Sequence, residues 1–223
     1  MRFNVLVVTA AVALMALAAA CGGGGGESPD YAPDASGTPA ENFDFNLLTS
    51  VVLRAGDVPP DYQVSGSFTP GSTEGVGFNS FLKNDGVTMT AGVARFRDVA
   101  ARDDVLDHQR RGLAKLIGPE SNLDLPGADA AYIYWTDNPD APAQAALMLR
   151  GQYWLTVVMQ ARTLGQTSVV TNKDTLTRYA QIMFDRLDTL MTRPGEVTPV
   201  PEFPTYAGGQ AQGTPPLPAT AVP

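Results

Sequence analysis

The sequence predicts an α+β fold in which an antiparallel sheet of about five to six strands carries two long helices on one face. Segments with alternating apolar and polar residues, as in half-buried strands, precede each of two long segments with the apolar spacing of an amphipathic helix. Two of the strand-like segments are joined through Gly151-Gln152, which is typical of an antiparallel hairpin. Both helices need an apolar partner, and one face of the sheet can serve them both.

Three strands are expected before the first helix. Pro59 and Pro60 exclude a helix and give the chain an extended lead-in. Strands are then expected over residues 62–68, 76–82 and 87–93. The last of these has an apolar side chain at every second position, so it should be half buried.

The first helix is expected over residues 98–117. Asp98 is a suitable N-cap, and Gly118 followed by Pro119 provides the stop. The side that should face the sheet is defined by residues at helical spacing, which are Val99, Leu106, Gln109, Leu113, Leu116 and Ile117.

Three more strands and a second helix follow. The strands are expected over residues 130–136, 144–150 and 153–162, the last two forming the hairpin. Thr171 and Asp174 resemble a capping box at the start of the second helix. The apolar stripe of this helix is wide and contains Leu176, Tyr179, Ala180, Met183, Phe184, Leu187, Leu190 and Met191.

The chain divides into four parts. Residues 1–20 have the features of a signal peptide, and residues 21–41 form a flexible linker rich in Gly, Pro and Ser. Residues 42–193 form a single α+β domain, which is long enough to be stabilised by its own core. Residues 194–223 are rich in Pro, Thr and Gly, and we expect them to form a disordered tail.

The single cysteine, Cys21, follows an apolar run and a row of small residues. The run over residues 5–17 is short for a membrane span, and Arg2 precedes it, as in cleaved export signals. Residues 17–21 resemble the lipobox of bacterial lipoproteins, with Ala18 where that motif prefers Leu. The resemblance implies that Cys21 carries acyl chains such as palmitate and becomes the first residue of the mature chain. The alternative is an ordinary secretory signal with a cysteine near its cleavage site.

The net charge restricts the classes of molecule that the protein can bind, and the cysteine content excludes an intramolecular disulfide. The formal net charge of −8 at pH 7 disfavours nucleic acid, because binding to it depends on neutralising phosphates. It also disfavours electrostatic binding to anionic lipid headgroups. With one cysteine no intramolecular disulfide can form. Contact with a membrane is therefore expected through the lipid on Cys21.

The sequence offers little for catalysis or metal binding. His108 is the only histidine, and no Gly-x-Ser-x-Gly elbow is present. Asp103, Asp104 and Asp107 lie beside arginines, which favours a solvated charged face over a calcium site. The turn at residues 137–140 has two carboxylates but lacks the spacing of an EF-hand loop. We therefore predict a protein without catalytic activity, metal site or cofactor.

Three motifs carry a resemblance to a loose group of exported bacterial α+β lipoprotein domains. They are Asp57-Val58-Pro59-Pro60-Asp61-Tyr62, Leu125-Pro126-Gly127-Ala128-Asp129-Ala130-Ala131-Tyr132 and Leu149-Arg150-Gly151-Gln152-Tyr153. The order of elements is more distantly similar to the PsbP and Mog1-like fold. The resemblance implies a binding or adaptor domain rather than an enzyme.

Aromatic residues suggest a binding surface. Trp154 and Val158 alternate with the residues expected to face the helices, so they should point to the other face of the sheet. With helices on one side only, that face would be open, and Trp135 or Tyr134 on the neighbouring strand would extend it. The alternative is that residues 43–53 or a loop cover this face.

The predicted function is that of a lipid-anchored binding or adaptor module of the cell envelope. The protein would be exported and held at the outer face of the cytoplasmic membrane or at the outer membrane, where it would contact an envelope protein or an apolar ligand. The alternative is a carrier that holds a lipid or glycan fragment in a cavity between the sheet and the helices. A carrier predicts a ligand that co-purifies, whereas an adaptor predicts a filled core.

Overall fold

Seven strands and two long helices make up the described part of the chain. The computed structural model describes residues 43–69, 75–135, 143–161 and 173–205. The strands are β1 (Gln63–Thr69), β2 (Gly75–Lys83), β3 (Val87–Phe96), β4 (Glu120–Asn122), β5 (Ala130–Tyr134), β6 (Ala143–Arg150) and β7 (Tyr153–Ala161). The long helices are α2 (Val99–Leu116) and α3 (Lys173–Thr192), and the short 3-10 helices are η1 (Phe45–Ser50), η2 (Ala55–Asp57) and η4 (Pro194–Glu196).

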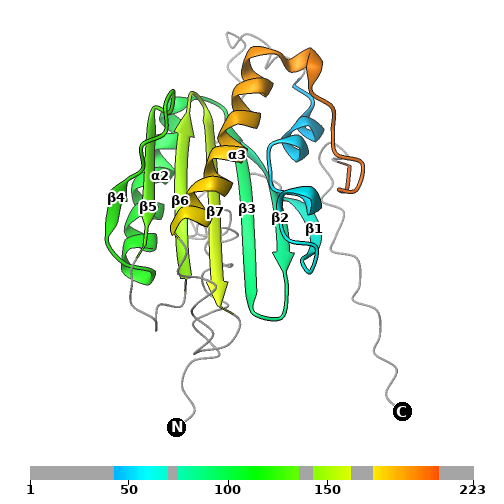
Figure 1. Ribbon diagram of the computed structural model, residues 1–223. Coiled ribbons are helices and arrows are strands. Elements are labelled where there is room, and N and C mark those ends of the chain that lie inside the picture. Colours follow the sequence, from blue (N-terminus) through cyan, green and yellow to red (C-terminus); the bar gives the residue numbers. More distant parts are fainter. Residues whose placement is uncertain (1–42, 70–74, 136–142, 162–172, 206–223) are drawn as a thin grey trace, which may run out of the picture.

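All seven strands belong to one sheet in the order β1-β2-β3-β7-β6-β5-β4, and every neighbouring pair is antiparallel (Figure 1). The predicted α+β class and the antiparallel sheet are confirmed. So is the hairpin between β6 and β7, where Gly151 has a φ of 53°. The sheet has more strands than expected, because β4 is a three-residue polar segment without the apolar alternation that reveals a strand.

The two long helices lie on opposite faces of the sheet, not on one face as the sequence suggested. Helix α3 packs on the face that carries Met148 and Leu155, which we call the α3 face, and α2 packs on the face that carries Leu147 and Val158, the α2 face (Figure 1). The reason lies in β6, in which residues 143–149 are all buried. A strand that is apolar on both sides needs cover on both faces of the sheet.

The predicted side of each long helix is buried or half-buried, with one exposed residue in each. In α2, the Asp98 carboxylate accepts a hydrogen bond from the backbone N–H of Ala101 at 2.8 Å, which confirms Asp98 as the N-cap and lowers its pKa. Leu106 is buried as expected, but Val99 is 45% exposed. The predicted stripe of α3 is buried except for Met191. Neither described long helix is apolar enough over its length to cross a membrane.

The segment before the sheet packs on the α3 face. Leu48 and Leu53, in and just after η1, are completely buried in the core beneath α3. Residues 43–53 therefore do not lie over the α2 face, which carries Trp154.

Residues 194–205 belong to the domain, in contrast to the predicted tail. Val200 and Phe203 are only 5% and 6% exposed, and the backbone N–H of Val200 donates to the hydroxyl oxygen of Thr49 at 2.9 Å. The proline-rich composition of this segment predicts disorder, but its two apolar residues dock on the core of the domain. Several predicted features lie outside the described residues, namely the signal peptide (1–20), the linker (21–41), the turn at residues 137–140, Thr171 and the remainder of the tail (206–223).

Candidate ligand-binding site

The four aromatic and apolar residues of the predicted binding surface do not form one exposed surface. Trp154, Val158 and Tyr134 lie on the α2 face, and Trp135 lies on the α3 face. Tyr134 is completely buried and Val158 is 5% exposed, because α2 covers this half of the sheet. The two tryptophans are half-buried. They therefore belong to two separate places.

Tyr134 is part of a polar cluster that joins α2 to the edge of the sheet. Its hydroxyl donates to Glu120 at 2.6 Å, and Arg110 donates to both carboxylate oxygens of Glu120 at 2.5 and 2.9 Å. The Arg110 guanidinium also lies 4.1 Å from the ring centre of Tyr132. Burial and the bond to Glu120 raise the pKa of Tyr134, and the bond from Arg110 lowers the pKa of Glu120. Each group in the cluster has a partner, so the cluster holds α2 in place.

Trp154 lies at the border of the region covered by α2. Its ring stacks on Phe96, with the ring centres 6.0 Å apart and the planes at 11°. Its indole nitrogen is buried and has no hydrogen-bond partner within the described ranges of the chain. The stacked pair is half-buried, so part of it remains accessible.

The most unusual polar groups lie on the α3 face. Gln144 on β6 is completely buried, and neither its amide nitrogen Nε2 nor its amide oxygen Oε1 has a hydrogen-bond partner in the part of the chain that the structure describes. The indole nitrogen of Trp135 is also buried, and none of the described residues accepts a hydrogen bond from it. Because Ala145 pairs with Tyr134, the next residues along the two antiparallel strands, Gln144 and Trp135, are neighbours on one face. We call these two residues the amide–indole site.

The first residue of α3 lies next to the amide–indole site. The ammonium nitrogen of Lys173 is 5.9 Å from the ring centre of Trp135. Met159 faces Gln144 across the β6–β7 ladder and is 2% exposed. An unpaired polar group in such an apolar environment costs about 1–3 kcal/mol. Native proteins rarely leave such atoms unpaired, so this place is a candidate for a bound water or ligand.

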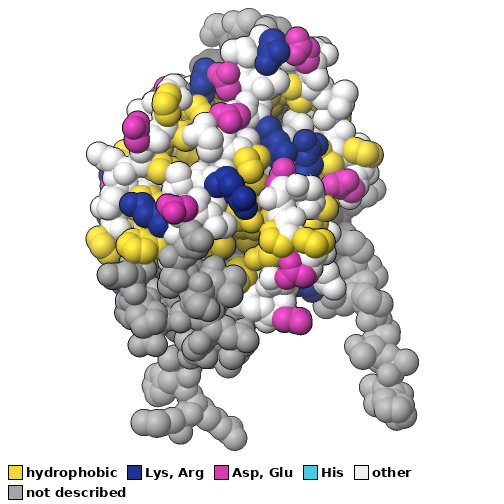
Figure 2. All heavy atoms as spheres, viewed as in Figure 1, with side chains coloured by type: hydrophobic (Ala, Val, Ile, Leu, Met, Phe, Trp, Pro, Cys, Tyr) yellow, Lys and Arg dark blue, Asp and Glu magenta, His cyan; other side chains and the backbone are white. Residues whose placement is uncertain are grey.

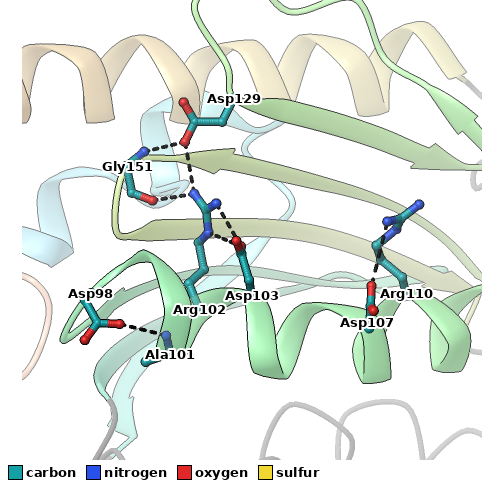
Figure 3. Close-up of polar contacts among 8 residues, drawn as sticks. All are labelled: Asp98, Ala101, Arg102, Asp103, Asp107, Arg110, Asp129 and Gly151. Carbon is teal, nitrogen blue, oxygen red and sulfur yellow. Dashed lines mark hydrogen bonds and ion pairs between the residues drawn. The ribbon is translucent and has the colours of Figure 1, made fainter.

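Ionic contacts elsewhere connect the elements of the fold. Arg102 in the first turn of α2 has a side chain only 6% exposed. Figure 3 shows its guanidinium reaching Asp103, Asp129 and the carbonyl oxygen of Gly151. Asp129 in turn accepts from the backbone N–H of Gly151 at 2.7 Å. This network fixes α2 to the β6–β7 turn. It gives a structural role to Asp129, the acidic residue of the motif at residues 125–132.

The acidic residue of the first motif has a similar role. Asp57 accepts two hydrogen bonds from Arg186 of α3, at 2.6 and 2.7 Å, and one from the backbone N–H of Arg54. The side chains of Asp57 and Arg186 are 10% and 21% exposed. This pair fixes the segment before the sheet to α3. Elsewhere on the α3 face acidic and basic side chains are interspersed (Figure 2).

The residues considered for catalysis or metal binding are not assembled into a centre. His108 is exposed on α2. Asp103 pairs with Arg102 at 2.8 Å, and Asp107 lies 4.0 Å from a nitrogen of Arg110 (Figure 3). Within residues 43–69, 75–135, 143–161 and 173–205, no three or more His, Cys, Asp or Glu side chains come together as metal ligands would.

Gln144 is the site residue that the sequence prediction missed. Gln144 lies on the same face of β6 as Ala146 and Met148, which point into the core. A single polar residue at a core-facing position of the strand could have indicated it from the sequence. Comparison of the chain with models of known families and with curated proteins finds no match. The site therefore has to be interpreted from its own chemistry.

Proposed function

We propose that the protein is a lipid-anchored binding protein of the cell envelope, without catalytic activity. Cys21 after a short apolar run supports the anchor. The amide–indole site supports the binding activity, since its three polar atoms have no partner among the described residues. A ligand at this site would lie between the sheet and the start of α3. The proposal thus favours the carrier alternative, with a ligand that has a polar group as well as apolar parts.

Native mass spectrometry of residues 22–223 tests the carrier proposal. The chain must extend past Phe203, because a form ending at Arg193 would lack two core side chains. We expect extra mass that is lost on denaturation and is absent from the Gln144→Met variant. An unliganded mass for the native protein, unchanged by lipid or envelope extracts, would contradict the carrier proposal.

The half-buried stack of Trp154 and Phe96 supports an adaptor as the second candidate function. An accessible aromatic pair beside a helix is a suitable contact for a partner protein. Crosslinking from position 154 in the intact envelope would reveal such a partner. A carrier without an adaptor role would give no specific crosslink there.

The anchor proposal makes a separate prediction. Replacing Cys21 with Ser removes the only thiol, so we expect the protein to move from the membrane fraction to the soluble fraction. The matched control is Ala18→Leu, which supplies the residue preferred by the lipobox and should leave the protein in the membrane. Fractionation followed by immunoblotting measures both. Membrane retention of Cys21→Ser would contradict lipid anchoring.

A further inference from the structure

The two edges of the sheet differ in how well they are protected against further pairing. Among the described strands, β1 and β4 lie at the ends of the sheet and each has one neighbour (Figure 1). Strand β4 has three residues, one of them the charged Glu120, and short or charged edges discourage pairing. Strand β1 has seven residues and contains neither a charged residue nor proline. A further strand can therefore add to the sheet at β1.

The sequence of β1 is complementary to itself in the antiparallel direction. We propose that two copies of the protein pair through β1, with a two-fold axis at Gly66, and form one continuous sheet. In this register Val64 lies opposite Phe68 of the second copy. Ser65 lies opposite Ser67 of the second copy, and the two Gly66 residues face each other. The proposal depends neither on the lipid anchor nor on the amide–indole site.

This register keeps the two faces of the sheet distinct. Val64 and Phe68 are half-buried against the core of the α3 face. Ser65 and Ser67 belong to the other face, because side chains alternate along a strand. A shift by one residue would place a serine beside each apolar side chain. The register centred on Gly66 aligns all seven residues of β1 and pairs apolar with apolar and polar with polar side chains.

Gly66 leaves room for aromatic rings at the proposed axis. The space that a Cβ of Gly66 would occupy is filled by the rings of Phe78 and Phe203, at 2.5 and 2.8 Å. The Phe203 ring therefore covers the α3 face of the strand at the axis, where it would contact the same ring of the second copy. With Val64 and Phe68, it would continue the apolar core of one protomer into the other.

A second copy fits β1 better than a strand of another protein. A foreign strand would require no two-fold symmetry in the sequence of β1. A symmetric contact also closes the assembly at two copies, because both β1 edges are then used. The edges that remain are the two β4 strands, which are short and polar. One seven-residue ladder is a small interface, so we expect a Kd on the order of 10 µM.

Disulfide crosslinking between two variants of residues 22–223 tests the register. These residues include every described element and contain no cysteine. Ser65→Cys and Ser67→Cys are prepared separately, one with a tag that changes its size. In the proposed register, the two thiols of the mixture lie on directly opposite residues, within the Cα separation of about 4.4–6.8 Å that a disulfide requires. We expect a crosslinked dimer from the mixture. Either variant alone should give about tenfold less, since identical positions are offset diagonally by about 7–8 Å.

Sedimentation velocity tests the contact without oxidation. We expect residues 22–223 to approach the dimer value at about 100 µM protein. Ser65→Lys/Ser67→Lys places like charges directly opposite each other and should weaken the dimer at least about tenfold. Ser65→Glu/Ser67→Glu should do the same, and mixing the two double variants should restore a dimer, which also shows that both are folded. The matched control is Ser121→Lys, at an exposed serine of the other edge strand, and it should leave the dimer unchanged.

The results either support or overturn the proposal. A monomer at about 100 µM, together with no excess crosslinking in the cysteine mixture, overturns self-association through β1. A dimer that resists both double variants, or that Ser121→Lys disrupts, places the contact elsewhere and also overturns it. Crosslinking of Ser67→Cys alone to the extent of the mixture rules out the register centred on Gly66. Binding of β1 only to extended peptides of other sequences would mean that the edge serves a different partner, against the proposal.

Discussion

Replacing Phe203 with Ala is expected to lower the free energy of unfolding by about 3–5 kcal/mol. Phe203 is 6% exposed and its ring centre lies 5.1 Å from that of Phe78 at an angle of 61°. Both rings press against the backbone of Gly66, where an added Cβ would be 2.8 Å from the Phe203 ring and 2.5 Å from the Phe78 ring. Removing one ring would open a cavity that this rigid sheet cannot close.

Urea unfolding of residues 22–223, followed by tryptophan fluorescence, measures the effect of Phe203→Ala. The control is Glu202→Ala, which changes an exposed neighbour and should alter stability by less than about 0.5 kcal/mol. Equal stability of the two variants would place the end of the folded domain near residue 193. That boundary is the one expected from proline content alone.

Replacing Arg186 with Met is expected to cost about 3 kcal/mol, because it leaves a nearly buried carboxylate without its cation. Arg186 donates two hydrogen bonds to Asp57 and one to the carbonyl oxygen of Val52 at 2.9 Å. Met retains the apolar stem, so the loss comes from the polar contacts. The Asp57 carboxylate keeps only its bond from the Arg54 backbone N–H.

The matched control for Arg186→Met is Arg193→Met. Arg193 pairs with Glu196 at 2.9 Å, but these side chains are 60% and 62% exposed. Exposed pairs contribute little, so the control should change stability by less than about 1 kcal/mol. Equal effects in urea unfolding would mean that burial does not strengthen the Asp57–Arg186 pair.

Local patterns predicted most of the elements but not their arrangement. Alternation and helical spacing are properties of short segments, so β3, the β6–β7 hairpin and α3 were predicted close to their observed bounds. The side of the sheet on which a helix packs depends on contacts between distant segments. The run of residues 143–149, which is apolar except for Gln144, was a local sign that both faces are covered. Val200 and Phe203 were missed because a docking segment needs no periodicity of its own.

The candidate site was predicted only in part. Trp135 was identified as an exposed aromatic candidate, but the feature that distinguishes it is a buried nitrogen without a partner. Whether a buried polar atom finds a hydrogen-bond partner depends on residues that are distant in the sequence. No local sequence pattern can therefore predict it. Gln144 could be flagged as a polar residue on an apolar strand, yet many such residues find a partner.

Strand β7 connects the described N-terminal end of the domain to the amide–indole site. Phe43, where the described chain begins, packs against Tyr153 at the start of β7, with the ring centres 6.4 Å apart. Met159 faces Gln144 near the end of the same strand, six residues further along, which corresponds to about 20 Å at the rise of a β-strand. Phe43 and the amide–indole site therefore lie toward opposite ends of β7.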